Sequence, residues 1–218
     1  MPKNQGVSLS VIKRLPRYYR FLGDLLKKDV TRISSRELAQ LMQLTASQIR
    51  QDLNCFGGFG QQGYGYNVAV LFREIGNILG LGRGTPTILI GVGNLGRTIA
   101  RHMDFESSGF QLIGLFDNSP AIIGQTVRDL PVQNIDGLDA FCREHSPKCA
   151  VLCIPREVAR STAERLVSLG VTNFWNFSHY DLLLDFDNLI VENVHLGDSL
   201  MTLCYQINAA DNAQAEKN

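Results

Sequence analysis

The sequence predicts an α/β fold in which a basic helical module precedes an acidic module of alternating strands and helices. Apolar, β-branched runs alternate with helical segments after residue 84, which is typical of a parallel sheet covered by helices. Charge divides at the same place: residues 1–84 hold 12 Lys and Arg against 5 Asp and Glu, and the rest of the chain holds 9 against 16. Such a split suggests two modules with different partners, although chance asymmetry would produce it as well.

The first module has the pattern of a helix-turn-helix. Residues 8–28 carry apolar side chains at helical spacing, and we expect Pro16 either to start a helix or to break one. Ser34 and Glu37 form a capping box that opens a short helix through about Leu41. We interpret Thr45 and Gln48 as a second capping box, opening a helix through about Asn54. Two short capped helices joined by a brief turn are typical of this motif.

In this motif the second helix enters the major groove of DNA with its N-terminal residues toward the base edges. Gln and Arg side chains can make paired hydrogen bonds to adenine and guanine respectively. Ile49 and Leu53, four residues apart, should face the core, and an ordinary solvated polar face is the alternative for the remainder. The predicted DNA-binding residues, including those of the wing described next, are Arg14, Arg17, Ser47, Gln48, Arg50, Gln51, Gly63 and Tyr64.

A ribbon of glycines and aromatic residues follows the second helix, over residues 56–66. After a recognition helix such a turn-rich segment predicts the β-wing of a winged helix. Its tip, at residues 62–64, would lie against DNA, while Phe56, Phe59 and Tyr66 pack beneath it. A helix over residues 68–79 and a glycine-rich linker complete a winged-helix domain that we place at residues 1–84.

The second module opens on a dinucleotide-binding pattern. An apolar run over residues 88–90 leads into Gly91-Val92-Gly93-Asn94-Leu95-Gly96 and a helix, and a second run over residues 110–116 ends at Asp117. In this pattern the glycines permit a sharp turn, close approach to a pyrophosphate and tight helix packing, and the acid binds the ribose. A glycine turn without a ligand is the alternative. The predicted cofactor-binding residues of this stretch are Gly91, Val92, Gly93, Asn94, Leu95, Gly96, Arg97 and Asp117.

The remaining pattern extends a Rossmann domain over residues 85–208, with a parallel, doubly wound sheet. Residues 122–124 and 130–132 should be short extended pieces. The continuous apolar run over residues 149–154 predicts a strand buried on both faces, ended by Pro155 at the edge where open α/β sheets bind ligands. Strands near residues 171–177 and 189–191 and a helix over residues 197–208 follow. Residues 209–218 should form a polar, frayed tail.

Several classes of protein are disfavoured by the same sequence. No apolar run is long enough to span a membrane, and no signal-peptide segment is present, so we expect a cytoplasmic protein. The five scattered cysteines suggest free thiols, and none has metal-ligand spacing. No catalytic constellation is apparent, and there is no room for a substrate domain. A small NAD(H)-dependent oxidoreductase whose basic module serves only assembly remains the alternative function.

Nine stretches of the chain carry a resemblance to one family: Arg14-Leu15-Pro16, Ser34-Ser35-x-x-Leu38, Gln48-Ile49-Arg50-Gln51-Asp52-Leu53, Phe56-Gly57, Gly63-Tyr64-Gly65-Tyr66, Gly93-Asn94-Leu95-Gly96, Phe116-Asp117, Pro155-Arg156-Glu157 and Asn176-Phe177. Over nearly its whole length the chain resembles the redox-sensing transcriptional repressors called Rex. The resemblance implies a homodimer with a swapped C-terminal helix, and an A·T-rich palindromic operator. It also implies release from DNA when NADH replaces NAD⁺, and control of genes for fermentation and NADH reoxidation.

The resemblance also implies where the nicotinamide and the switch lie. Pro155, Phe177 and the partner's Leu196 would form an apolar pocket, which should favour the neutral ring of NADH over the charged ring of NAD⁺. His102 and His195 stand where the family more often has tyrosine and aspartate in a redox-switch network, and Gln51 stands where lysine is usual. Because of the two histidines, a DNA-bound scaffold that no longer senses redox state is a third interpretation.

Overall fold

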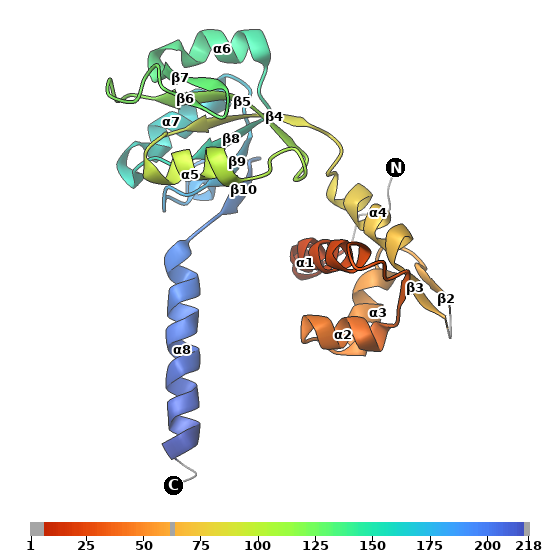
Figure 1. Cartoon of the computed structure of the whole chain (residues 1–218). Helices are drawn as coiled ribbons and strands as arrows, with labels where there is room; N and C mark the ends of the chain where they lie inside the picture. The colour runs from red at the N-terminus through yellow and green to blue at the C-terminus, as the bar shows by residue number, and fades with distance from the viewer. Residues whose placement is uncertain (1–6, 62–63, 216–218) are drawn as a thin grey trace. The chain divides into compact units, whose positions relative to one another are not determined.

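The computed structural model describes residues 7–61 and 64–215, and the chain divides into two compact units, Met1–Arg83 and Gly84–Asn218. The division falls within the glycine-rich linker. The first unit holds four helices and three short strands among its described residues (Figure 1). These elements are α1 (Leu9–Leu26), β1 (Arg32–Ile33), α2 (Ser35–Met42), α3 (Ala46–Asn54), β2 (Gly60–Gln61), β3 (Gly65–Asn67) and α4 (Val68–Leu79).

The helix-turn-helix prediction is confirmed in α2 and α3. Ser34 Oγ accepts a hydrogen bond from the Glu37 amide while the Glu37 carboxylate accepts one from the Ser34 amide, so the first capping box is complete. The second box is wrong. Thr45 Oγ1 accepts a hydrogen bond from the Gln48 amide, but the Gln48 side chain donates to Asp52 rather than accepting from the Thr45 backbone amide. The Asp52 carboxylate lies one turn along the same helix and is a charged acceptor, so its bond to the Gln48 NH₂ group is stronger than the neutral bond that the Thr45 amide would donate to the Gln48 oxygen.

Proline at position 16 neither starts nor breaks a helix, contrary to expectation, because α1 continues through it. An interior proline removes one backbone hydrogen bond from a helix. The helix is held on both sides of this point by side chains in the core of the unit: Leu15, Tyr18 and Leu22 are fully buried. Pro16 itself is exposed. Tertiary packing therefore outweighs the local cost.

The wing is a three-stranded antiparallel sheet with the strand order β1-β3-β2. Tyr66 is buried beneath it, and Phe56 and Phe59 pack against the same core, as predicted. Gly65 has a φ of +68°, and a Cβ there would lie 2.5 Å from the carbonyl oxygen of Ile33. Only glycine therefore lets β3 turn this closely past β1.

The second unit is a Rossmann fold built on a seven-stranded sheet with the order β10-β9-β8-β4-β5-β7-β6, parallel except for the edge strand β6 (Figure 1). Its strands are β4 (Thr85–Ile90), β5 (Phe110–Asp117), β6 (Thr126–Val127), β7 (Leu130–Asn134), β8 (Cys149–Leu152), β9 (Asn173–Asn176) and β10 (Ile190–Asn193). Its α-helices are α5 (Asn94–His102), α6 (Leu138–His145), α7 (Arg156–Ser168) and α8 (Leu196–Ala215), with short 3₁₀ turns at Ile135–Gly137 and Leu182–Leu184.

Separate apolar layers cover the two faces of this sheet. Residues of α6 and α7 pack on one face, and residues of α5 pack on the other. Every residue of β8 is buried, as its apolar run predicts. The order of the strands reverses around β4 and β8, so the carboxyl ends of these strands form the switch point at which open α/β sheets bind ligands.

Two expectations about the second unit are wrong. Residues 122–124 form a turn rather than an extended piece, with the Ile122 amide donating to the Ser119 carbonyl. The predicted tail from residue 209 is helical as far as Ala215, because α8 continues through it. Four alanines between residues 209 and 215 explain the continuation, since alanine has the highest helix propensity.

Candidate functional site

The glycine turn after β4 has the geometry that dinucleotide binding requires. Gly91 has a φ of +91°, and a Cβ there would lie 2.4 Å from the carbonyl oxygen of Cys153. A Cβ on Gly96 would lie 1.9 Å from the carbonyl oxygen of Gly91. Both positions therefore admit only glycine, the first because of its backbone conformation and the second because α5 packs directly on the turn.

Gly93 has a different environment from the other two glycines. A Cβ at this position would meet no heavy atom within 4 Å, so the space beside it is open. Gly93 is also the N-cap of α5, and it provides no side-chain hydrogen bond to the helix. The first amides of an α-helix lack partners within the helix and carry partial positive charge. A pyrophosphate would fit this open, uncapped helix end.

Asp117 ends β5 beside the turn and is 8% exposed. Its Oδ2 accepts a hydrogen bond of 2.6 Å from the Val92 amide, and its Oδ1 accepts one of 2.8 Å from the Ser119 amide. The carboxylate thus holds the glycine turn against the sheet. Each oxygen retains a second lone pair, with which it could accept a ribose hydroxyl.

The other predicted cofactor residues surround this turn in different states of exposure. Val92 is buried, Asn94 and Leu95 are exposed on the first turn of α5, and Arg97 Nη2 donates a hydrogen bond of 2.7 Å to Gln125 Oε1. Pro155 is exposed at the start of α7, next to the carboxyl end of β8. Phe177 lies mostly in the core, edge-on to Trp175.

His102 and His195 do not contact each other within one chain. His102 is exposed at the end of α5. His195, just before α8, has its Nδ1 3.1 Å from Nδ1 of His179, and the two rings are nearly parallel. No motif in the sequence points to His179 as its neighbour. No group of three or more possible metal ligands occurs among residues 7–61 and 64–215.

Two cysteines, Cys149 at the start of β8 and Cys153 directly after its end, have suppressed reactivity. Burial raises the pKa of Cys153 to about 12 and, against weaker hydrogen bonds from Thr87 and the Trp175 backbone, the pKa of Cys149 to about 11. Because the thiolate is the nucleophile, both thiols are inert near neutral pH. All five cysteines are free.

On the first unit, the exposed surface of α3 holds three of the predicted DNA-binding residues. Ser47, Arg50 and Gln51 are at least partly exposed, and Arg50 Nη1 donates to Ser35 Oγ across the helix-turn-helix. Ile49 and Leu53 face the core, as predicted. The helix therefore presents a polar face with one guanidinium.

Three other predicted DNA contacts are engaged inside the unit. Arg14 donates two hydrogen bonds of 2.7 Å to the carboxylate of Asp52, and Gln48 donates one of 2.8 Å to the same group. Arg17 Nη2 donates to the carbonyl oxygen of Met42 at the end of α2. Arg14 and Arg17 therefore join α1 to the helix-turn-helix, which the sequence pattern did not indicate.

The wing contributes Tyr64, whose side chain is 70% exposed. Arg32 from β1 places its guanidinium over the Tyr64 ring and donates to the Tyr64 carbonyl oxygen. Gly63, the other residue predicted there, lies outside the described residues. Arg32 thus gives the wing sheet a positive charge, which the segment over residues 56–66 does not supply.

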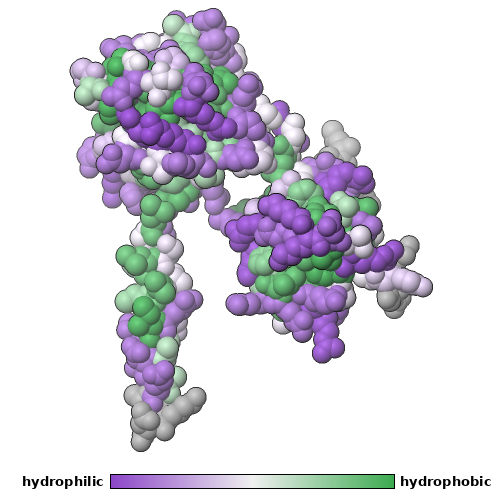
Figure 2. All heavy atoms as spheres, viewed as in Figure 1, coloured by the Kyte–Doolittle hydropathy of each residue, from purple (hydrophilic) through white to green (hydrophobic). Residues whose placement is uncertain are grey.

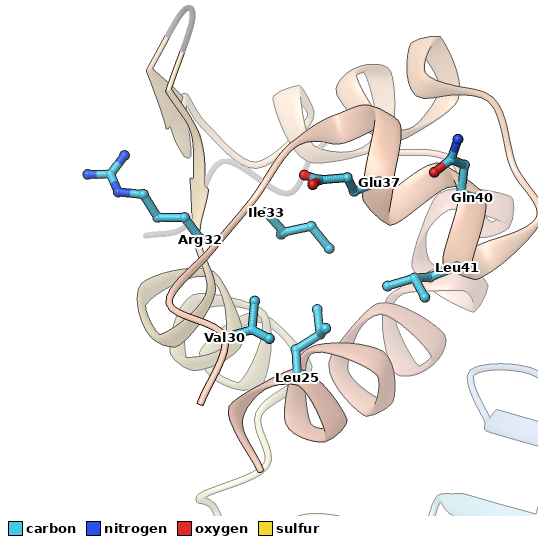
Figure 3. A pocket seen from close by; sticks show the side chains of 7 residues that line it. All are labelled: Leu25, Val30, Arg32, Ile33, Glu37, Gln40 and Leu41. Carbon is cyan, nitrogen blue, oxygen red and sulfur yellow. The ribbon is translucent and has the colours of Figure 1, made fainter. Parts of the chain in front are cut away.

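A groove of about 440 Å³ lies elsewhere on the first unit (Figure 3). Its wall is mainly apolar, from Leu25, Val30, Ile33 and Leu41, and the Arg32 side chain points away from it. None of the predicted DNA-binding residues lines the groove, although Arg32 and Ile33 of the wing strand β1 do.

Comparison with known families assigns a class to each unit. Residues 6–54 match the family described as "Putative DNA-binding protein N-terminus", and residues 83–180 match the "CoA binding domain" family. These matches and the fold define a winged-helix DNA-binding protein joined to a nucleotide-binding Rossmann domain. No helix among the described residues has the length and apolarity needed to cross a membrane.

Relatives that match nearly the whole chain give a more specific assignment than the matches to each unit. A protein of Thermoanaerobacter pseudethanolicus named "Redox-sensing transcriptional repressor Rex" is 53% identical over 95% of this chain and 92% of its own length. A Clostridium perfringens protein of the same name is 48% identical over 97% and 99%. The chain belongs to the Rex family of redox-sensing transcriptional repressors. It is therefore a regulator, and the oxidoreductase interpretation is wrong.

Solved structures agree over the same length. A crystal structure of RSP in complex with β-NAD⁺ and operator DNA has a TM-score of 0.87 and 51% identity, covering 97% of both chains. A structure of RSP in complex with β-NADH has a TM-score of 0.88 and 48% identity, covering 96% of this chain and 98% of that one. RSP is described as a Rex-family repressor.

Proposed function

We propose that this chain represses transcription by binding a palindromic, A·T-rich operator as a homodimer, and that NADH in place of NAD⁺ at the glycine turn releases it. The observation that supports this most directly is the open space at Gly93, above an uncapped helix end and beside Asp117. RSP was crystallised both with NAD⁺ and operator DNA and with NADH, and it shares this fold.

Discrimination between the two cofactors would arise beside the glycine turn. NADH carries a neutral nicotinamide ring and NAD⁺ a positively charged one. Pro155, Phe177 and the partner's Leu196 would surround the ring with apolar side chains, and burial of an unpaired charge there is costly. Residues Asn94, Leu95 and Arg97, next to the helix end, would contact the rest of the nucleotide.

The exposed apolar surface of α8 supports the homodimer. Leu196, Leu200, Leu203 and Ile207 recur at helical spacing, and each is at least 49% exposed in the single chain. Figure 2 shows apolar residues along this helix. A stripe of this kind normally marks an interface, and we propose that it packs on the Rossmann unit of a second copy.

We further propose that the spacing of two recognition helices is what the cofactor controls. A dimer reaches two half-sites only when its recognition helices lie about one turn of DNA apart. The DNA-binding residues would be Ser47, Gln48, Arg50 and Gln51 on α3, Gly63 and Tyr64 on the wing, and Arg14 and Arg17 on α1. The regulated genes would serve fermentation and NADH reoxidation, and the protein would act in the cytoplasm.

The switch itself would depend on His102 and His195, which a dimer could bring together across the interface. A Rex-family protein that binds DNA but no longer responds to redox state is the competing interpretation. The two differ in one observable, which is whether operator affinity depends on the oxidation state of the cofactor.

The test uses the full chain and a palindromic duplex obtained by selection with this protein from a randomised library. Fluorescence anisotropy at one fixed salt concentration measures its affinity with saturating NAD⁺ and with saturating NADH. We expect NADH to weaken binding about tenfold to a hundredfold, in line with coupling energies of roughly 1–3 kcal/mol. Equal affinities with both cofactors would contradict the switch, and failure to select any sequence would contradict the repressor function.

A further inference from the structure

Asp52 is an acidic residue in the helix proposed to read DNA, and it is almost completely buried, with 1% exposure. Its Oδ2 accepts hydrogen bonds from Arg14 Nε at 2.7 Å and from the Tyr18 hydroxyl at 2.9 Å. Its Oδ1 accepts from Arg14 Nη2 at 2.7 Å and from Gln48 Nε2 at 2.8 Å. A carboxylate has about four acceptor positions, so this one is fully occupied.

The network removes one ambiguity from Gln48. An ionised carboxylate can only accept hydrogen bonds, so the Gln48 amide must direct its NH₂ group, and not its oxygen, toward Asp52. The Gln48 oxygen and its second N–H remain for a further partner. An acceptor and a donor side by side are the groups that match the major-groove edge of adenine.

Arg14 is anchored by the same carboxylate. Two of its five N–H groups are used by Asp52, and three remain for other acceptors. Its side chain is 29% exposed, so the guanidinium is only partly enclosed. Two residues predicted to contact DNA, one on α1 and one on α3, therefore share one buried anchor.

The Asp52 carboxylate stays ionised over the physiological pH range. Burial by itself raises the pKa of Asp52, but the hydrogen bonds from Arg14, Gln48 and Tyr18 outweigh burial and leave the pKa below its usual value. Burial and the Asp52 hydrogen bond raise the pKa of the Tyr18 hydroxyl, which therefore stays a donor. The folded state has the full stabilisation from Asp52 above the ordinary aspartate pKa, and loses it as pH falls from there through the lower pKa of the folded state.

We propose that Asp52 is a positioning residue for DNA recognition, which fixes the orientation of the Gln48 amide and the place of Arg14 without touching the operator itself. This rests on the proposed function, because it takes α3 as the helix that reads base edges. Specificity at one base pair of each half-site would then depend on a residue that is hidden from DNA.

The test is Asp52→Asn, which keeps the size of the side chain. An amide has one oxygen and one NH₂ group, so either orientation sets an NH₂ group against an Arg14 donor, and the network cannot re-form. We expect operator affinity to fall at least about tenfold. The preference at the base pair that Gln48 contacts should be lost, which is measured with duplexes changed one base pair at a time.

Two comparisons separate positioning from simple loss of structure. Gln48→Ala identifies the base pair concerned, and Asp52→Asn combined with Gln48→Ala should have no further effect on preference there. Ile49→Val, at a fully buried position of the same helix, lowers the stability of the unit without touching the network, and its base-preference profile should match the parent's.

The results that would contradict the positioning role of Asp52 differ from those that would contradict the proposed repressor function. If Asp52→Asn keeps the parent's base preferences, or if its effect on preference adds to that of Gln48→Ala, the positioning role is wrong while repression stands. If the parent protein itself shows no sequence preference, the repressor function fails as well. Should Asp52→Asn not fold, Arg14→Lys is the second variant. It replaces the guanidinium, which donates two hydrogen bonds to Asp52, with a single ammonium group. It should also broaden the preference at the Gln48 base pair, and an unchanged profile would overturn the proposal.

Discussion

Gly93→Ala is expected to fold like the parent and yet lose at least about tenfold in affinity for both NAD⁺ and NADH. The added methyl group would meet no protein atom within 4 Å, and the φ of −65° at this position suits alanine, so stability should change by less than about 0.5 kcal/mol. The methyl group would instead occupy the space through which a pyrophosphate approaches the amides of α5. Thermal unfolding and isothermal titration with each cofactor measure the two effects.

Substitutions at two other glycines of the same unit serve as controls for this variant. Gly137→Ala, also in open space in the same unit, should change neither stability nor cofactor affinity. Gly96→Ala, whose Cβ would lie 1.9 Å from a backbone oxygen, should lower stability by about 3 kcal/mol or more. A Gly93→Ala protein that binds both cofactors as tightly as the parent would show that the nucleotide does not lie on this turn.

Leu203→Glu is expected to convert the dimer to a monomer and to reduce operator affinity about a hundredfold. Leu203 lies in the apolar stripe of α8, where a buried, unpaired charge would oppose association. A monomer has only one recognition helix, so it loses the gain in affinity from bivalent binding, which is commonly about 10²–10⁴-fold. Light scattering reports the mass, and anisotropy with the selected duplex reports the affinity.

The control for this variant adds the same charge elsewhere on the helix. Gln206→Glu lies off the stripe and should leave both mass and affinity unchanged. Two results would show that α8 does not make the functional interface. One is that Leu203→Glu still forms dimers over the same concentration range as the parent. The other is that monomeric Leu203→Glu binds the full palindrome as tightly as the parent.

The parts of the protein that depend on local chemistry could be predicted from the sequence. Gly91 and Gly96 have the backbone conformation and the close contacts that their spacing implies, because a tight turn between a strand and a helix limits the residue at each position. Asp117 lies beside this turn, as its spacing predicts, and its contact with a ribose stays a prediction. The capping box at Ser34 and the core positions Ile49 and Leu53 follow from helix geometry alone.

The parts that depend on pairing across the fold could not. Arg14 and Asp52 are 38 residues apart, and no local pattern shows that they bond. One signal was present: Asp52 lies beside Leu53 and three residues after Ile49, on the inward face of the helix, where a charge requires a partner. The contact between His179 and His195 and the passage of α1 through Pro16 likewise depend on tertiary packing.

The most direct test of redox control measures NADH affinity twice, once with the free protein and once with the protein saturated by its selected operator. Coupling between two sites is reciprocal, so the factor by which NADH weakens operator binding must equal the factor by which the operator weakens NADH binding. We predict a loss in NADH affinity of about tenfold to a hundredfold on the operator, with a much smaller change for NAD⁺. Identical NADH affinities in the two states would contradict control of DNA binding by the cofactor.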